Sequence, residues 1–383
     1  MKQGILGGMC LFALCAILVA GLWPFHAPKN EVSWLSDRNG LLFGDYGSIL
    51  SSGEFKMQSL REDGPCSLEI WSQPGATFDS NDIVAFSAQR NPVQFAVAQS
   101  GDDLFVLRDI PDEQNHLKTT HIAVDHVFRQ RKELLVTITS GAQGTAVYIN
   151  GTLVKRAPQF RISRKDFSGR LVIANSPVET NTWGGQLWGL GIYNKELTSA
   201  QVLQHYHRWA GNNGHELDGD GDALALYLFN EHTGKVVHNE VALGSDLYIP
   251  EHYFVLHQQF LTPPWKEFEN NWTYWENVAL NIGAFIPLGF LFSAYFSLVR
   301  QIKRSTAIAI VLGFAVSLAI EILQGFLPTR SSGMTDLITN GSGTALGAGL
   351  YVWLAKRSLL GSGPLSAWQS NYSRLFCQRE ILH

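Results

Sequence analysis

Long apolar segments with almost no charged residues constrain the fold of this chain more than any other feature. Four such segments occur in the 383 residues, at positions 5–23, 278–299, 307–327 and 337–354. A helix needs about 20 predominantly apolar residues to cross the hydrocarbon core of a bilayer. The lengths of these segments therefore predict a membrane protein with about four transmembrane helices.

The first apolar segment has a second interpretation, because a secretory signal peptide also begins with a positive charge such as Lys2. The apolar core of a signal peptide is usually shorter, about 7–15 residues, and a cleavage site with small residues follows it. Here the segment ends in Trp-Pro-Phe-His-Ala-Pro, which has no such site. The sequence favours an uncleaved transmembrane helix.

Basic residues at the ends of the apolar segments predict the orientation in the membrane. The short connection 300–304 holds three of them, Lys356 and Arg357 follow the last segment, and Lys2 precedes the first. Basic residues near transmembrane helices stay on the cytoplasmic side. We therefore expect a multi-pass protein of the bacterial inner (cytoplasmic) membrane with both termini in the cytoplasm. Arg330 lies in the opposite loop, where a functional role explains it better than a topological one.

The polar stretch 31–250 has the pattern of an all-β domain. Short runs of alternating apolar residues recur about every ten positions, with turn residues between them, as in a β-sandwich. Asn150-Gly151 between two such runs predicts a hairpin with a type I′ turn. Residues 198–209 are the one helical exception, with Thr198 as its N-cap. The predicted fold class is thus an all-β jelly-roll sandwich inserted into an α-helical membrane bundle.

These patterns divide the chain into five parts. We expect a transmembrane helix at 1–24, the β-sandwich at 31–250, an interfacial linker at 251–276, a three-helix membrane domain at 277–357 and a cytoplasmic tail at 358–383. The linker contains several tryptophans and tyrosines, which favour the headgroup layer of a bilayer. Packing of these rings against the β-domain is the alternative.

Polar residues recur at helical spacing in the last three apolar segments. They are Asn277, Asn281, Ser317, Glu321, Gln324, Arg330, Asp336 and Asn340. A spacing of four residues places side chains on one face of a helix, and a carboxylate in a membrane span needs a partner or a polar cavity. The predicted orientation places Glu321 in the outer half of the membrane. Two roles remain open: a structural cluster that joins the helices, or a site for a lipid-linked or headgroup-like ligand. A catalytic role is disfavoured, because no histidine, cysteine or nucleophile–base pair accompanies the cluster.

The C-terminal residues resemble the VanZ-like family. The motif that carries the resemblance consists of Ser317, Glu321, Gln324, Phe326, Arg330, Asp336, Asn340 and Gly343. Asn277 and Asn281, followed by Phe-Ile-Pro-Leu-Gly-Phe, resemble the helix that precedes this motif. The resemblance implies a multi-span membrane protein of a family named for an association with resistance to the glycopeptide teicoplanin. The β-domain would then be an insertion in its first outer loop.

The inserted domain resembles the concanavalin A-like, laminin-G-type jelly rolls. The opening strand at 32–43, the hairpin strand at 147–151, the Gly-Gly-Gln-Leu-Trp segment at 184–197 and the run 225–231 carry this resemblance. Calcium is common in this lectin-like fold, so Asp218, Asp220 and Asp222 are weak candidates for a metal site. An EF-hand is excluded, because Ala223 and Phe229 stand where that loop needs Gly and Glu. We otherwise expect no cofactor.

Many glucanases with this fold carry Glu-x-Asp-x-x-Glu on one strand, which supplies two carboxylates for catalysis. The nearest match begins at Glu216, and Gly221 stands in place of the last glutamate. The sequence therefore favours a binding or spacer module over an enzyme. Trp183 and Trp188 are candidates for glycan contact, with ordinary core packing as the alternative.

The predicted partners are membrane lipid and an envelope polysaccharide or lipid-linked glycan. A net charge of −4 gives no support for nucleic-acid binding. Cys66 is alone in the soluble part, so no disulfide is expected there. The function predicted is that of an envelope membrane protein with an external lectin-like domain, with a link to glycopeptide resistance. The alternative is a scaffold for other proteins that binds no sugar.

Overall fold

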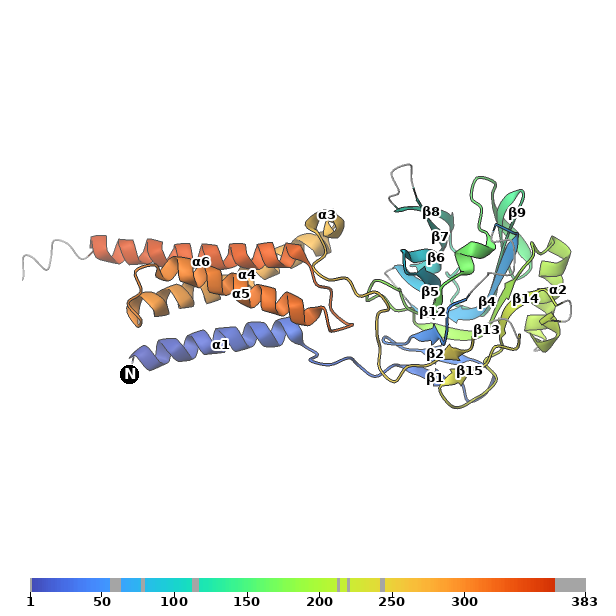
Figure 1. The fold of residues 1–383 in the computed structure, drawn as a ribbon, viewed down its shortest axis with the longest axis horizontal. Coiled ribbons are helices and arrows are strands. Elements are labelled where there is room, and N and C mark those ends of the chain that lie inside the picture. The colour runs from blue at the N-terminus through green and yellow to red at the C-terminus, as the bar shows by residue number, and fades with distance from the viewer. Residues whose placement is uncertain are drawn as a thin grey trace, which may run out of the picture. The chain divides into compact units, whose positions relative to one another are not determined.

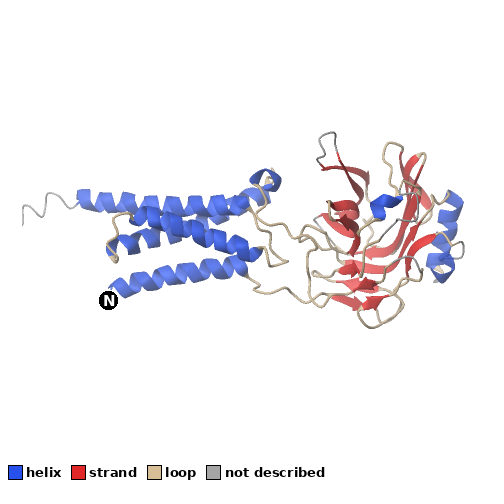
Figure 2. Ribbon diagram, viewed as in Figure 1, coloured by secondary structure: helices blue, strands red, loops and turns tan. Residues whose placement is uncertain are grey.

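The computed structural model describes residues 2–55, 63–76, 80–111, 117–211, 214–218, 221–241 and 245–361. The chain forms two compact units (Figure 1). One consists of the first 25 residues together with the chain from Gln259 onward, and the other is His26–Gln258. The first unit is helical and the second is mostly β-sheet (Figure 2).

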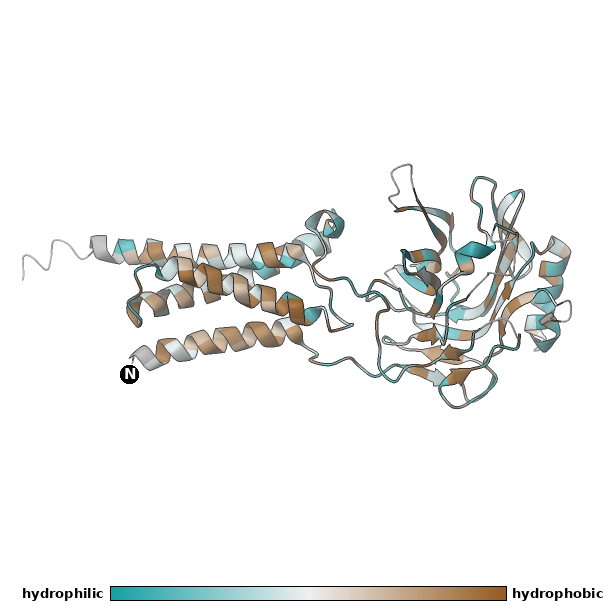
Figure 3. Ribbon diagram, in the orientation of Figure 1, coloured by the Kyte–Doolittle hydropathy of each residue, from teal (hydrophilic) through white to brown (hydrophobic). Residues whose placement is uncertain are grey.

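The helical unit contains α1 (Lys2–Leu22), α3 (Pro264–Glu267), α4 (Trp272–Leu298), α5 (Ser305–Gln324) and α6 (Met334–Gly361). Asn271 caps α4, because its side chain accepts a hydrogen bond from the Tyr274 amide at 2.8 Å. Apolar residues dominate α1, α4 and α5 (Figure 3). Glu321 is the only acidic or basic residue on α5.

Three helices among the described residues are long and apolar enough to cross a membrane: Gly4–Leu22, Trp272–Leu298 and Ser305–Gln324. The predicted number of about four is therefore not confirmed. Helix α6 forms where the fourth span was expected, but its first half is rich in threonine, serine, asparagine and glycine, which lowers its hydropathy. Helix α4 also begins earlier than the predicted span, at Trp272.

Glycines allow the backbones of helices α4 and α6 to pack in direct contact. A Cβ atom at Gly289 would lie 2.0 Å from the Thr344 carbonyl oxygen, and one at Gly347 would lie 2.0 Å from that of Ile286. Gly343 faces the Ile282 carbonyl oxygen in the same way, at 2.3 Å. Small residues four apart let two helices approach closely in a membrane bundle. This contact fixes the position of α6 against α4.

The β-unit consists of two eight-stranded antiparallel sheets, which confirms the predicted sandwich. The first sheet contains β1 (Val32–Trp34), β2 (Leu41–Phe43), β13 (Gly185–Tyr193), β4 (Cys66–Pro74), β9 (Leu134–Gly141), β10 (Gly144–Ile149) and β11 (Thr152–Ala157), with β14 (Ala223–Tyr227) paired to β13. The second sheet has the order β15 (Val236–Val237), β16 (Leu247–Tyr248), β3 (Ile49–Ser51), β12 (Arg170–Ile173), β5 (Ser80–Ala88), β6 (Asn91–Ser100), β7 (Asp103–Pro111) and β8 (Leu117–Val124). Side chains of both sheets form one apolar core.

The Asn150-Gly151 turn joins β10 and β11 as predicted. Asn150 has φ 51° and Gly151 has φ 79°, the positive values that a type I′ turn requires. Ile149 pairs with Thr152 directly beside this turn. The expected helix is α2 (Ser199–Ala210), and Thr198 caps it by accepting a hydrogen bond from the Gln201 amide.

The two ends of the β-unit lie side by side. The Asn30 amide donates to the Glu251 carbonyl at 3.1 Å, and the Tyr253 amide donates to the Pro28 carbonyl at 3.0 Å. Tyr253 is buried, so the sandwich continues past residue 250 into the segment 251–276 that was predicted to be a linker. Adjacent ends allow a domain to be inserted into a loop of another domain without strain.

Candidate functional site

Glu321 lies in the last turn of α5 and is buried. Its carboxylate accepts a hydrogen bond from the Gly333 amide at 2.7 Å, just before the first residue of α6. The first amides of a helix have no partner within the helix and carry partial positive charge. Glu321 therefore acts as a cap for α6 from a different helix.

Glu267, which is not among the residues predicted from the sequence, completes this cap. Its carboxylate accepts a hydrogen bond from the Thr335 amide at 2.9 Å, and the Met334 amide between the two capped positions donates to the Thr262 carbonyl at 2.9 Å. Glu267 lies on the short helix α3, where no apolar periodicity marks it as special. The only signal in the sequence is its place among the aromatic residues of the linker.

Two polar pairs hold α6 to its neighbours. The Asn281 side chain on α4 donates to the Asp336 carboxylate at 2.7 Å. One turn further along α6, the Asn340 side chain donates to the Ser317 hydroxyl on α5 at 3.0 Å, and both groups are buried. The predicted helical spacing thus brings these four residues together in pairs, each of which links two helices.

Arg330 and Gln324 bind the end of α1. The Arg330 guanidinium donates to the Trp23 carbonyl, with Nε at 3.0 Å, and the Gln324 amide donates to the Gly21 carbonyl at 2.8 Å. These carbonyls belong to the end of α1, where the carbonyl groups lack partners within the helix. Arg330 therefore binds the end of α1, whereas Glu321 caps the beginning of α6.

We call Glu267, Asn281, Ser317, Glu321, Gln324, Arg330, Asp336 and Asn340 the polar cluster. Three of its carboxyl groups are close enough to interact electrostatically: those of Glu321, Asp336 and Glu267. Asn277 is exposed one turn before Asn281, and no hydrogen bond of its side chain is found among the described residues. The oxygen of the buried Asn340 side chain likewise accepts no hydrogen bond from the described residues. The contacts of the cluster join five helices, α1, α3, α4, α5 and α6, and the cluster gathers three carboxyl groups at one end of the bundle.

Exposed aromatic side chains lie on α3 and at the beginning of α4. Trp265 is 78% exposed, Trp272 is 82% exposed and Trp275 is 52% exposed. Rings of this kind favour the boundary between hydrocarbon and water. Since Trp265 belongs to α3, which also carries Glu267, this boundary lies near the polar cluster.

The predicted glycan-contact residues are buried in the sandwich, which corrects the expectation that their rings are available to a sugar. Trp183 is 0% exposed, and its indole donates to the Gln99 side chain at 2.8 Å. Trp188 is 4% exposed, and the Arg38 guanidinium lies over its ring at 4.0 Å. Trp183 packs in the main core between the two sheets, whereas Trp188 on β13 packs in a second apolar cluster with Trp71 and with Trp209 of α2.

The predicted metal-site aspartates are placed only in part. Asp220 and the side chain of Asp218 lie outside the described residues. Asp222 forms an ion pair with Lys195, which links the start of β14 to the end of β13. Within the described ranges, no three His, Cys, Asp or Glu side chains are grouped as metal ligands. Cys66 is buried, and this burial raises the pKa of its thiol.

The β-unit also contains a buried polar network around Glu69, which is not among the residues predicted from the sequence. Glu69 on β4 is 0% exposed and accepts hydrogen bonds from Tyr193 and Trp209, each at 2.9 Å. His205 on α2 lies 3.1 Å from the same carboxylate. The network attaches α2 to the first sheet. No local pattern indicates it, since Tyr193, His205 and Trp209 lie more than 120 residues from Glu69 in the chain.

Two family models match this chain. Residues 226–355 match VanZ/LLP1, and residues 48–203 match the concanavalin A-like lectin/glucanases superfamily. Both resemblances found in the sequence are thereby confirmed. The VanZ/LLP1 match begins in β14, earlier than the resemblance at 277–357. This match and the three apolar helices identify a membrane protein with a lectin-like domain. No curated protein matches the chain at a significant level.

Several solved structures are similar to part of this chain. The binding domain of botulinum neurotoxin DC, solved with rat synaptotagmin II, is 16% identical over 47% of this chain and 45% of its own, with a TM-score of 0.34. The binding domain of Paraclostridial Mosquitocidal Protein 1 is 12% identical over 48% and 47%, with a TM-score of 0.31. A heptameric SAP-like pentraxin from Limulus polyphemus is 14% identical over 47% and 80%, with a TM-score of 0.31. This chain spans less than half of either of these two binding-domain chains.

Proposed function

We propose that this chain is a multi-pass protein of the bacterial inner membrane whose β-unit binds glycan outside the cytoplasm. One observation carries the proposal: a lectin-like sandwich is inserted between the first and second apolar helices of a VanZ/LLP1-type chain. The adjacent ends of the sandwich, joined through Asn30 and Glu251, support its role as an inserted module. The helical unit anchors this module at the membrane.

The basic residues support an external position for the β-unit. Residues 300–304 between α4 and α5 hold three basic residues, and Lys356 and Arg357 lie near the end of α6. With these residues in the cytoplasm, the loop between α1 and α4 is external. The polar cluster then faces the outer leaflet. There it can meet the headgroup of a lipid-linked glycan, which provides a physical route to glycopeptide (teicoplanin) resistance.

The proposed role is binding without catalysis and without a resident cofactor. The support is the incomplete carboxylate motif, in which Gly221 stands where a glucanase has its last glutamate. The carboxylates of Glu321 and Glu267 are both committed to capping α6. Binding needs neither group to change its protonation state.

A glycan array with the full chain in lipid nanodiscs tests the proposal. We expect binding to at least one class of envelope-type polysaccharide, measured in calcium and again in EDTA. Empty nanodiscs serve as the control. If no sugar binds under either condition while envelope proteins co-purify with the chain, the proposal is wrong and the chain is a protein scaffold.

A further inference from the structure

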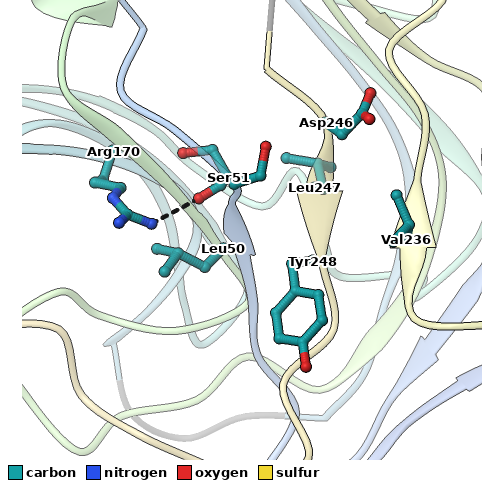
Figure 4. A pocket seen from close by; sticks show the side chains of 8 residues that line it. Leu50, Ser51, Arg170, Val236, Asp246, Leu247 and Tyr248 are labelled. Carbon is teal, nitrogen blue, oxygen red and sulfur yellow. Dashed lines mark hydrogen bonds between the residues drawn. The ribbon is translucent and has the colours of Figure 1, made fainter.

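A pocket of about 440 Å³ lies at the β15 end of the second sheet (Figure 4). Its lining comes from β3, β12, β15 and β16 and from the residues beside them. The lining residues are Leu50, Ser51, Ser52, Arg170, Val236, Asp246, Leu247 and Tyr248. All of them belong to the β-unit and to the described residues.

The register of the strands forms the apolar side of this pocket. Tyr248 pairs with Val236 on one side and with Leu50 on the other. Residues paired directly across neighbouring strands project to the same face of a sheet. Tyr248 is 43% exposed and Val236 is 37% exposed, whereas the alternate residues Leu247 and Val237 are buried in the core. The pocket therefore has an exposed aromatic ring beside two aliphatic side chains.

Two opposite charges form the polar side. One guanidinium nitrogen of Arg170 donates to the Ser51 carbonyl at 2.8 Å, which holds this side chain against β3. Asp246 is held by the Asn239 amide, which donates to Oδ1 at 2.9 Å, and its Oδ2 lies 3.4 Å from His238 Nδ1. In Figure 4, Arg170 and Asp246 lie on either side of Ser51. The pocket thus offers fixed donors on one side and a fixed acceptor on the other.

We infer that this pocket is the glycan subsite of the β-unit and that it takes a neutral pyranose residue; this inference rests on the proposed function. A pyranose ring has an apolar C–H face, which can pack on the Tyr248 ring, and hydroxyl groups around its edge. Charged hydrogen-bond partners bind hydroxyl groups more strongly than neutral partners do. Apolar walls with a few positioned polar groups are typical of small-ligand sites. An acidic sugar would be repelled by Asp246 and an amino sugar by Arg170, whereas a neutral ring can hydrogen-bond to both groups without repulsion from either.

The test uses the full chain in nanodiscs on immobilised dextran, mannan and galactan, which are neutral, and on hyaluronate, which is acidic. We expect one or more neutral polysaccharides to bind. Tyr248→Ala should weaken that binding at least tenfold, and Tyr248→Phe, which keeps the ring, should stay within about threefold of the parent chain. Val154→Ala on β11 is the matched control, because Val154 is also 43% exposed but lies at the edge of the other sheet. Thermal unfolding of each variant verifies that the fold is intact.

A second variant, Asp246→Asn, retains an oxygen for the Asn239 amide and removes the charge. We expect it to bind the neutral polysaccharide at least fivefold more weakly and to gain affinity for hyaluronate. If the parent chain binds sugar but Tyr248→Ala and Asp246→Asn bind equally well, the site lies elsewhere and the proposed function stands. Binding of hyaluronate alone by the parent chain overturns the sugar class. Binding of none of these polysaccharides, and of no glycan on the array, overturns both the subsite and the proposed function.

Discussion

The Glu321 carboxylate lies 2.7 Å from the Gly333 amide, so a residue at the end of α5 caps the beginning of α6. The contact is buried, which makes it costly to break. A buried hydrogen-bonding group left without a partner costs about 1–3 kcal/mol. The capping contact, more than the negative charge, should therefore determine how much this residue stabilises the bundle.

Glu321→Ala should lower the stability of the chain in detergent by about 1–3 kcal/mol, because the Gly333 amide loses its acceptor. Glu321→Gln keeps an oxygen at the same place and should lose much less. Thermal unfolding of the purified variants measures both effects. Glu276→Ala, at an exposed position on α4, is the control. Equal stability of Glu321→Ala and the control would show that the cap contributes nothing.

Gly347→Ala should destabilise the helical unit by about 1–3 kcal/mol, because its Cβ would lie 2.0 Å from the Ile286 carbonyl and force α4 and α6 apart. Gly349→Ala on the same helix is the matched control, since no atom lies within 4 Å of its added Cβ. Detergent unfolding curves should separate the two variants. Two superimposable curves would contradict the close packing of α4 on α6.

Glu69→Ala should destabilise the sandwich by about 3–5 kcal/mol. The substitution removes the buried acceptor shared by His205, Tyr193 and Trp209. Glu133→Ala breaks the exposed ion pair with Arg38 instead and should cost less than about 1 kcal/mol. Urea unfolding monitored by tryptophan fluorescence measures both. A cost for Glu69→Ala as small as for Glu133→Ala would mean that the network is not important for stability.

Asp82 should make the stability of the sandwich depend on pH. Burial, followed by repulsion from Glu179, raises the pKa of Asp82 to about 7, although a hydrogen bond from Ser176 lowers it. An unfolded aspartate has a pKa of about 3.9. At pH values between about 4 and about 7, Asp82 is protonated in the folded chain but has lost its proton in the unfolded chain. The contribution of Asp82 to stability is therefore complete below about pH 4 and is lost as the pH rises through about 7.

Asp82→Asn should accordingly match the parent chain at pH 4 and exceed it at pH 8 by roughly 1–2 kcal/mol. The rise of the pKa from about 3.9 to about 7 sets an upper limit of about 4 kcal/mol, and the partial exposure of the side chain reduces it. Unfolding curves at several pH values give this difference. Asp125→Asn, at an exposed position, is the control. A difference that does not change with pH would contradict the raised pKa.

The predicted orientation can be measured with reporter fusions. A cytoplasmic reporter fused after Gly361 should be active, and one inserted near residue 150 in the β10–β11 turn should be inactive, because basic residues hold the α4–α5 connection in the cytoplasm. A periplasmic reporter should give the opposite pattern. Inverted activities at both positions would place the β-unit and the polar cluster on the cytoplasmic side.

Local sequence patterns determined the elements of this protein and their types. Alternating residues specified the sandwich, Asn150-Gly151 specified its hairpin, and apolar length specified the helices. Helical spacing also selected Ser317, Glu321, Asp336 and Asn340, because residues four apart share a helix face whatever their partners are. Asn277 shows the limit of this argument. Asn277 lies four residues before Asn281 on the same face of α4, yet it is exposed. Spacing shows which residues share a helix face, but it does not show how much of that face a neighbouring helix covers.

Only the tertiary structure decided which residues meet. Arg330 has the charge to pair with Glu321, but its guanidinium donates to the Trp23 carbonyl, 307 residues away in the chain. Glu267, Glu69 and the pocket around Tyr248 have no signal in local periodicity, because each depends on elements far apart in sequence. Trp183 and Trp188 were interpreted by residue type, but burial decided their role. Periodicity is a property of neighbouring residues, whereas partners and exposure are set by long-range packing, which one sequence does not encode locally.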